Sequence, residues 1–244
     1  MFDITKHKIY LDFIDELNPI AIKFYNANKK RKDPILTKRE EFVFDIFHKL
    51  NEIEKKLKDL NYSVMFFSVY PNYKPWRDNI TREDYIIYHL EYYYINIIAL
   101  FDRLLHFVNF IYNLGLSDHF VTLKCITTND HVDKNTVRIL KKIDTALQGI
   151  RSTQNKIKHK KKHRDKKLYH ASLIEFHGRH NTFSEYTKEL NQELQSDMNY
   201  FYREYLRTKK QELIKNNKVL GDTIKILLDN IFPIYEKRKL EVSK

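Results

Sequence analysis

Residues 81–115 read TREDYIIYHLEYYYINIIALFDRLLHFVNFIYNLG, and the expected architecture follows from this stretch. Its apolar residues recur at alternating intervals of four and three: Ile86, Leu90, Tyr93, Ile97, Leu100, Leu104, Phe107 and Ile111. Those intervals are the repeat of one face of an α-helix. A second apolar row runs beside the first: Ile87, Tyr94, Ile98, Phe101, Leu105 and Val108. So wide an apolar face requires contacts on several sides. The pattern therefore predicts a long central helix at about 81–114.

Further helices are predicted where a capping residue precedes an apolar row. Thr37 with Glu40 has the spacing of a capping box, and Thr81 with Asp84 opens the central helix, which is expected to end near Gly115. The row after Thr37 consists of Val43, Ile46, Leu50, Ile53, Leu57 and Leu60. Three more helices are expected: one capped by Asp133 and running into residues 151–159, one opened by Thr182 with Glu185, and one at about 219–231.

Two segments are expected to depart from regular helix. The piece from Ile9 to Tyr25 is predicted to be helical but interrupted at Pro19. Residues 63–70 are rich in aromatic and β-branched side chains and are bounded by Pro71, so they indicate extended chain. A lone strand has no partner in such a chain, and we expect a covering segment. The fold class expected is all-α, a multi-helix bundle forming one domain over 1–244.

Composition excludes several classes of protein. The chain has 4 Gly in 244 residues, and neither a dinucleotide-binding fingerprint nor a phosphate-binding loop is present. The single cysteine, Cys125, excludes an internal disulfide and a cysteine-based zinc site. We find no apolar run of membrane-spanning length and no signal-peptide core, so we expect a cytoplasmic protein with no membrane partner. The net charge of +12 favours a polyanionic partner, with nucleic acid first.

The segment from Ile150 to His159, IRSTQNKIKH, is the strongest candidate for chemistry. Between residues 151 and 170 there are nine Lys or Arg and a single acid, Asp165. If the segment is helical, Arg151, Asn155 and His159 share one face, because each step of four residues turns the position by only about 40°. An unperturbed histidine titrates near pH 6.5, so it can take the proton of a ribose 2′-hydroxyl at about neutral pH. An arginine beside it would stabilise the charge on the reacting phosphate.

The same segment resembles the signature of HEPN domains, which have an arginine, usually an Asn or Asp, about three further residues, and a histidine. The resemblance covers about residues 81–180. It implies a HEPN-like core at about 81–217, with a helical extension over 1–80. HEPN domains are bundles of four or five helices that commonly dimerise, and many are metal-independent ribonucleases of toxin–antitoxin, CRISPR and phage-defence systems.

In this chain, Asn155 and His159 match the polar and catalytic positions of that signature. Gln154 stands where the family has its arginine, and an amide lacks the charge that a guanidinium brings to phosphate. Arg151, one turn earlier, is the candidate substitute. The resemblance implies a homodimeric, metal-independent endoribonuclease with no cofactor, whose partners are RNA and an antitoxin or defence protein. His159 would be the acid/base, Arg151 the phosphate clamp, and Asn155 and Gln154 polar positioners.

The remaining candidates are a basic surface and two secondary residues. The RNA-binding candidates are Lys156, Lys158, Lys160, Lys161, Lys162 and Arg164. Arg164 and Asp165 with His170 have the spacing of a second motif, and Asp102 is a polar residue of the central helix that would orient the first. The histidines of 159–180 lack cysteines and lie among lysines, so no metal is expected there. Two alternatives stay open: an inactive HEPN-like module that binds nucleic acid or protein, and an unrelated helical scaffold.

Overall fold

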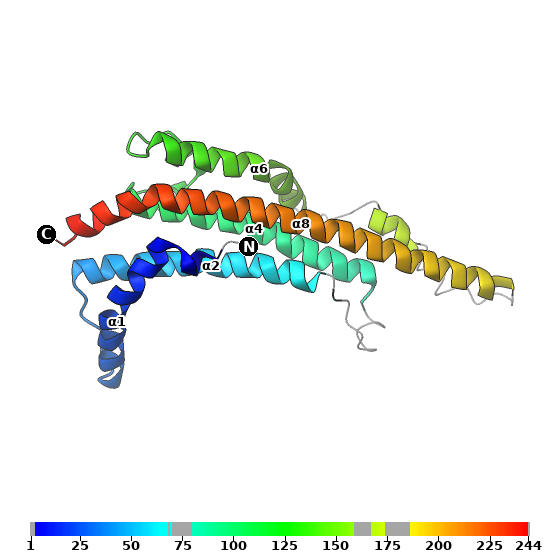
Figure 1. Cartoon of the computed structure of the whole chain (residues 1–244), viewed down its shortest axis with the longest axis horizontal. Coiled ribbons are helices and arrows are strands. Elements are labelled where there is room, and N and C mark those ends of the chain that lie inside the picture. Colours follow the sequence, from blue (N-terminus) through cyan, green and yellow to red (C-terminus); the bar gives the residue numbers. More distant parts are fainter. Residues whose placement is uncertain (1–2, 68, 70–79, 159–166, 174–185, 244) are drawn as a thin grey trace. The chain divides into compact units, whose positions relative to one another are not determined.

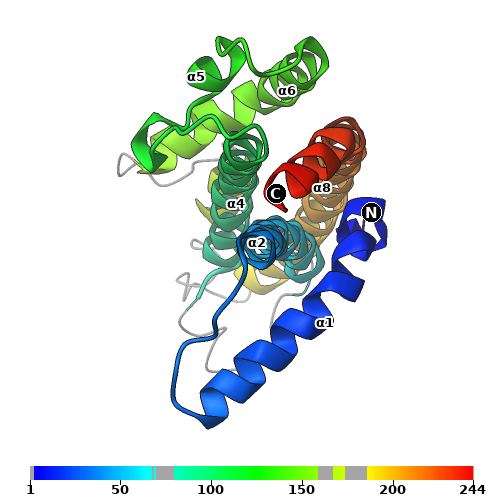
Figure 2. The same ribbon diagram turned by 90° about the vertical axis from the view of Figure 1, so that its left-hand side faces the viewer.

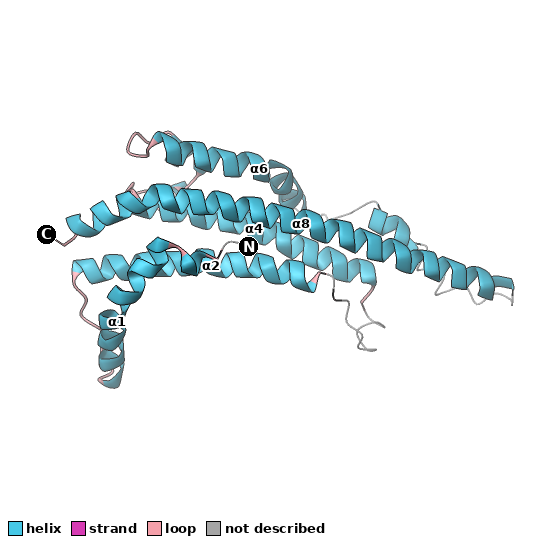
Figure 3. Ribbon diagram, in the orientation of Figure 1, coloured by secondary structure: helices cyan, strands magenta, loops and turns pink. Residues whose placement is uncertain are grey.

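The computed structural model describes residues 3–67, 69, 80–158, 167–173 and 186–243 (Figure 1). Its elements are the short 3-10 helices η1 (Ile4–Lys6) and η2 (Asp118–Phe120) and the helices α1 (Lys8–Lys29), α2 (Lys38–Phe66), α4 (Arg82–Ile111), α5 (Leu123–Thr127), α6 (Lys134–Lys158) and α8 (Tyr186–Glu241). Residues 167–173 are also helical. The described residues contain no strand (Figure 3), so the prediction of an all-α bundle with a long central helix is confirmed.

The predicted helix starts carry the hydrogen bonds that their sequences indicate. The Thr37 backbone N–H donates to Glu40 Oε2 at 2.8 Å, and the Glu40 N–H donates back to Thr37 Oγ1 at 3.2 Å. This reciprocal pair is a capping box. The Asp84 N–H donates to Thr81 Oγ1 at 3.0 Å, and Asp133 Oδ1 accepts the N–H of Thr136 at 3.0 Å. At the other end of α4, Gly115 has a φ of +67°, which suits glycine in the turn that follows the helix.

The buried faces of α2 and α4 follow the predicted rows. All six residues predicted for α2 are buried, and the row continues through Val64 and Phe67. Both predicted rows of α4 are buried along the whole helix, from Ile86 to Ile111. The buried residues of α2 and α4 therefore recur at the predicted spacing of four and three residues.

Three local predictions are wrong. Residues 63–66 belong to α2, because Val64 continues the buried row of that helix and burial outweighs strand propensity. The helix α1 runs through Pro19, which lies on its exposed side beside the buried Ile20. The helix expected at 219–231 is the end of α8, since Leu213 and Asn217 extend its buried row toward the N-terminus. Thr182 and Glu185, expected to open a separate helix before the one at 219–231, lie outside the described residues.

The chain divides into two compact units. Unit 1 consists of residues 1–58, 97–148 and 218–244, and unit 2 consists of residues 59–96 and 149–217. The helices α2, α4, α6 and α8 each contribute a segment to both units. The predicted core at 81–217 and extension at 1–80 divide the chain differently and stay predictions.

In unit 1, α2, α4 and α8 lie together, with α1 on one side and α5 and α6 on another (Figure 2). Phe42 of α2 lies between two other rings, with its centroid 5.7 Å from that of Phe110 and 6.3 Å from that of Tyr235. Asp12 of α1 accepts hydrogen bonds from the Tyr235 hydroxyl at 2.7 Å and from Lys239 Nζ at 2.6 Å. Aromatic packing and a charged cluster thus attach α1 and α2 to the end of α8.

In unit 2, one polar contact joins three helices in the interior. The Tyr93 hydroxyl of α4 donates to Asn217 Oδ1 of α8 at 2.8 Å, and Asn217 Nδ2 donates to the Leu60 carbonyl of α2 at 3.5 Å. Tyr93 is 0% exposed and Asn217 is 2% exposed. Burial raises the pKa of the Tyr93 hydroxyl, so the group stays a neutral donor. Because a buried amide needs its partners, this contact fixes the register of the three helices.

One described helix, α4, is long and apolar enough by length and composition to cross a membrane, with a mean hydropathy of 1.3 over its most apolar window. This corrects the expectation that no apolar run has that length. In the protein, 61% of the window is buried, as in the core helix of a helical bundle.

We expect the substitution Tyr93→Phe to lower the free energy of unfolding by about 1–3 kcal/mol, because it leaves Asn217 Oδ1 buried without its donor. Urea denaturation measures the change. The matched control is Tyr92→Phe, which removes a hydroxyl from a side chain that is 40% exposed and should change stability by less than about 0.5 kcal/mol. Equal stability of the two variants would show that the contact does not fix the register.

Candidate functional site

The C-terminal part of α6 carries the described residues of the predicted motif, and it presents them on different sides. Gln154 is 3% exposed, while its neighbours Asn155 and Lys156 are exposed and Arg151 is half-buried. Consecutive residues of a helix point about 100° apart, so Gln154 and Asn155 cannot serve the same surface. The three residues of the predicted motif that precede His159, namely Arg151, Gln154 and Asn155, therefore do not all converge on one volume.

The position of Gln154 on α6 explains its burial. Gln154 lies seven residues after Leu147 and fourteen after Leu140, both of which are buried. Seven residues are close to two turns of helix, so Gln154 occupies the buried row of α6. The interval of three and four residues that predicted the other helices also contains this information. The arginine-bearing signature compares side-chain types and does not indicate which face of the helix is buried.

Arg151 and Asn155 remain on one face, as their separation of four residues predicts. The residue that would complete this face, His159, lies outside the described residues. The same holds for Lys160, Lys161, Lys162 and Arg164. Lys158 is the last residue of α6, and its side chain is not among those that the structure describes. The roles of these six residues stay predictions.

The two secondary candidates lie in different units. His170 is exposed on the helical residues 167–173 of unit 2, which Leu168 and Ala171 anchor by burial. Asp102 is exposed on the part of α4 that belongs to unit 1, whereas Arg151 and Asn155 belong to unit 2. The orienting role expected for Asp102 stays a prediction.

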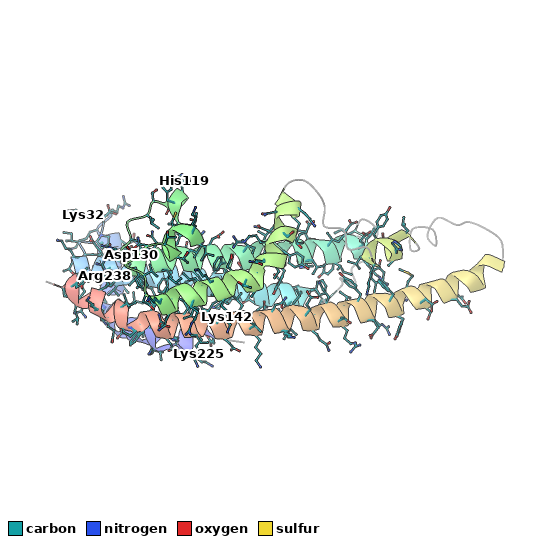
Figure 4. All side chains as sticks on the ribbon, turned by 90° about the horizontal axis from the view of Figure 1, so that it is seen from above. Lys32, His119, Asp130, Lys142, Lys225 and Arg238 are labelled. Carbon is teal, nitrogen blue, oxygen red and sulfur yellow. The ribbon has the colours of Figure 1, made fainter. Side chains whose placement is uncertain are left out.

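Unit 1 has one short run of exposed cations at residues 29–32, and its other positive charges are more scattered. Lys142 of α6 and Lys225 and Arg238 of α8 lie on separate turns and helices (Figure 4). None of them belongs to a run comparable with residues 156–167, which hold eight Lys or Arg. The concentrated positive charge of the sequence therefore follows α6, next to the proposed motif.

Unit 2 also contains a pocket that sequence patterns did not predict. Its volume is about 230 Å³, and its lining comprises Phe67, Arg82, Tyr85, Ile86, Asn199, Tyr202, Arg203 and Leu206. The α4 residues are spaced at i, i+3 and i+4, and the α8 residues at i, i+3, i+4 and i+7, so each set forms one helix face. In the sequence, the pocket is indicated only by an arginine near tyrosines at helical spacing in each of the two segments. The packing of α4 on α8 shows that these two sets of residues line one pocket.

Unit 1 has a wider, more polar cleft of about 610 Å³ between α2, α4 and η2. His48 and Glu52 of α2 line it together with Arg103 and His106 of α4 and Asp118 of η2. Arg103 lies 3.5 Å from Glu52, and His106 Nδ1 lies 3.6 Å from Asp118. Because carboxylates and basic side chains line the cleft together, its lining does not favour an anionic ligand over a cationic one. Among the described residues, no group of three His, Cys, Asp or Glu is arranged to hold a metal ion.

Comparison with protein-family models, with curated proteins and with solved structures finds no match to the chain. The likeness to HEPN domains therefore depends on the quoted residues alone.

We expect Gln154→Arg to lower the free energy of unfolding by at least about 2 kcal/mol, because it places an unpaired charge in the interior. Asn155→Arg adds the same side chain at the next, exposed position and should change stability by less than about 0.5 kcal/mol. Thermal and urea denaturation of both variants measure the difference. Tolerance of Gln154→Arg, with a gain of RNA cleavage, would instead place residue 154 in an open catalytic cleft.

Proposed function

We propose that the protein is a metal-independent endoribonuclease, with a catalytic face formed by Arg151, Asn155 and His159 at the end of α6. The observation that carries the proposal is the arrangement of Arg151 and Asn155. They lie one turn apart on one face of a helix whose sequence continues into His159 and the basic run, with Asn155 exposed and Arg151 half-buried. A cation, an amide and an imidazole are the groups that cleavage by an adjacent 2′-hydroxyl requires.

The proposed reaction is an internal transfer of the phosphodiester. The 2′-oxygen attacks the adjacent phosphorus while His159 takes the proton of the 2′-hydroxyl. The bond from phosphorus to the 5′-oxygen of the next nucleotide then breaks. A protonated group, either a side chain or water, gives a proton to that leaving oxygen. The products are a 2′,3′-cyclic phosphate and a 5′-hydroxyl. Arg151 would neutralise the charge that builds up on the phosphoryl oxygens, and the lysines from 156 onward would attract the RNA backbone.

The burial of Gln154 favours a second candidate, an RNA-binding module without catalytic activity. At this position the signature has its arginine, and here the side chain is an uncharged amide that lies in the protein interior. A protein of this kind that had lost catalytic activity would be expected to lack the arginine charge on its catalytic face. In this candidate the basic run binds RNA and His159 has no catalytic role.

Cleavage of a mixed RNA by the purified protein in excess chelator separates the two candidates. We expect His159→Ala to reduce cleavage by at least about 100-fold, the usual contribution of a general acid or base. His170→Ala tests the second motif, and under this proposal it should leave the rate within about twofold. The control is His131→Ala, which removes an exposed histidine outside both motifs. The fragments should end in cyclic phosphate.

Undiminished cleavage by His159→Ala would contradict the proposed mechanism, and loss of cleavage in His170→Ala alone would move the acid/base to the second motif. If neither the wild type nor the variants cleave RNA but all bind it with an affinity that falls steeply with salt, the binding module is the correct function.

A further inference from the structure

The pocket of unit 2 is built from the first turn of α4 and one face of α8. Arg82, Tyr85 and Ile86 line it from α4, and Asn199, Tyr202 and Arg203 line it from α8. The Tyr85 hydroxyl lies 3.0 Å from the Phe66 carbonyl oxygen and 2.6 Å from that of Val69, and its one proton is donated between them, which holds the chain after α2 beside α4. The walls are thus fixed by helix packing and by backbone contacts.

The charged side chains that line the pocket in the described part of the chain are positive. Among those residues there are two arginines and no carboxylate. Arg82 donates a hydrogen bond to Asn199 Oδ1, and its guanidinium lies 5.5 Å from the centre of the Tyr202 ring, so its position is set by two neighbours. Arg203 is exposed, and among the described residues it has no ion-pair partner. An anion in the pocket would therefore meet Arg82, whose position is fixed by its neighbours, and Arg203, which is accessible.

The rest of the lining is apolar and partly aromatic. Tyr202, Ile86 and Phe67 are buried at 3%, 2% and 1% exposure, so they form the floor. The volume of about 230 Å³ is smaller than the roughly 300–1,000 Å³ of pockets for drug-sized ligands. A single planar ring system is the ligand of this size that aromatic and aliphatic walls favour. An attached phosphate would lie against the arginines, where charge-assisted hydrogen bonds form.

We propose that this pocket binds one nucleobase together with the phosphate of its nucleotide. We assign that nucleotide to an unpaired position of an RNA strand, and this assignment rests on the proposed function. Base stacking does not require a particular base, so the pocket would select single-stranded RNA over duplex RNA and not one sequence over another.

The test uses 2-aminopurine riboside 5′-monophosphate, a fluorescent nucleotide, titrated into the full chain. We expect Arg203→Gln to raise the Kd at least about ten-fold through loss of a charge-assisted contact. The matched control Arg207→Gln removes the same charge one turn further along α8, where Arg207 pairs with Glu204, and should leave the Kd within about twofold. Leu206→Trp, which fills the pocket without changing its charge, should also weaken binding.

Two further measurements separate the base, the phosphate and the source of the ligand. The riboside without phosphate should bind more weakly to the wild type and respond little to Arg203→Gln. A short single-stranded oligoribonucleotide should displace the fluorescent nucleotide, whereas the same RNA as a duplex should not.

Binding that is unchanged by both Arg203→Gln and Leu206→Trp would overturn the pocket assignment, whatever the outcome of the cleavage assay. Binding that depends on Arg203 but is not displaced by single-stranded RNA would overturn the assignment to RNA and identify a site for free nucleotides. Displacement by RNA in a protein that does not cleave would uphold the pocket while the nuclease proposal fails.

Discussion

The burial of α4 in both units is the constraint on which the rest of the structure depends. Its buried residues from Ile86 to Ile111 cover more than one face of the helix, and only a narrow row that includes Tyr88, Asp102 and Arg103 is exposed. In unit 1 it meets α2 through the stacked rings of Phe42 and Phe110. In unit 2 it meets α8 through the hydrogen bond from Tyr93 to Asn217. Apolar burial supplies most of the driving force, and the buried amide adds specificity, because it accepts only one register.

Much of this fold is predictable from the sequence, because the apolar interval of helices α2 and α4 is unbroken and their first turns carry capping residues. The errors occur where a local preference opposes burial. Pro19 is a poor helix residue, yet α1 continues through it, because the proline lies on the exposed side of that helix. Residues 63–66 have side chains that favour strands, yet Val64 continues the buried row of α2. In each case, the packing of distant segments outweighs what neighbouring residues prefer.

The candidate site is less predictable than the fold, because a short motif names side chains without fixing their directions. Spacing correctly places Arg151 and Asn155 on one face of α6. The interval that buries Leu140 and Leu147 also buries Gln154, and this separates the amide from the proposed catalytic face. The pocket between α4 and α8 illustrates the opposite case. Arg82 and Arg203 are 121 positions apart in the chain, and no local pattern indicates that they line one cavity. Such a site is found only after the helices are packed.

If the proposed function is correct, RNA meets the face of α6 that carries Asn155 and not the face that carries Gln154. Thiol labelling tests it most directly, since the one native cysteine can be removed by Cys125→Ser. Single variants Asn155→Cys and Gln154→Cys in that background would be labelled with a maleimide, with and without RNA. We expect rapid labelling at position 155 that RNA suppresses, and slow labelling at position 154 that RNA leaves unchanged. Rapid labelling at 154, or labelling at 155 that ignores RNA, would contradict this expectation.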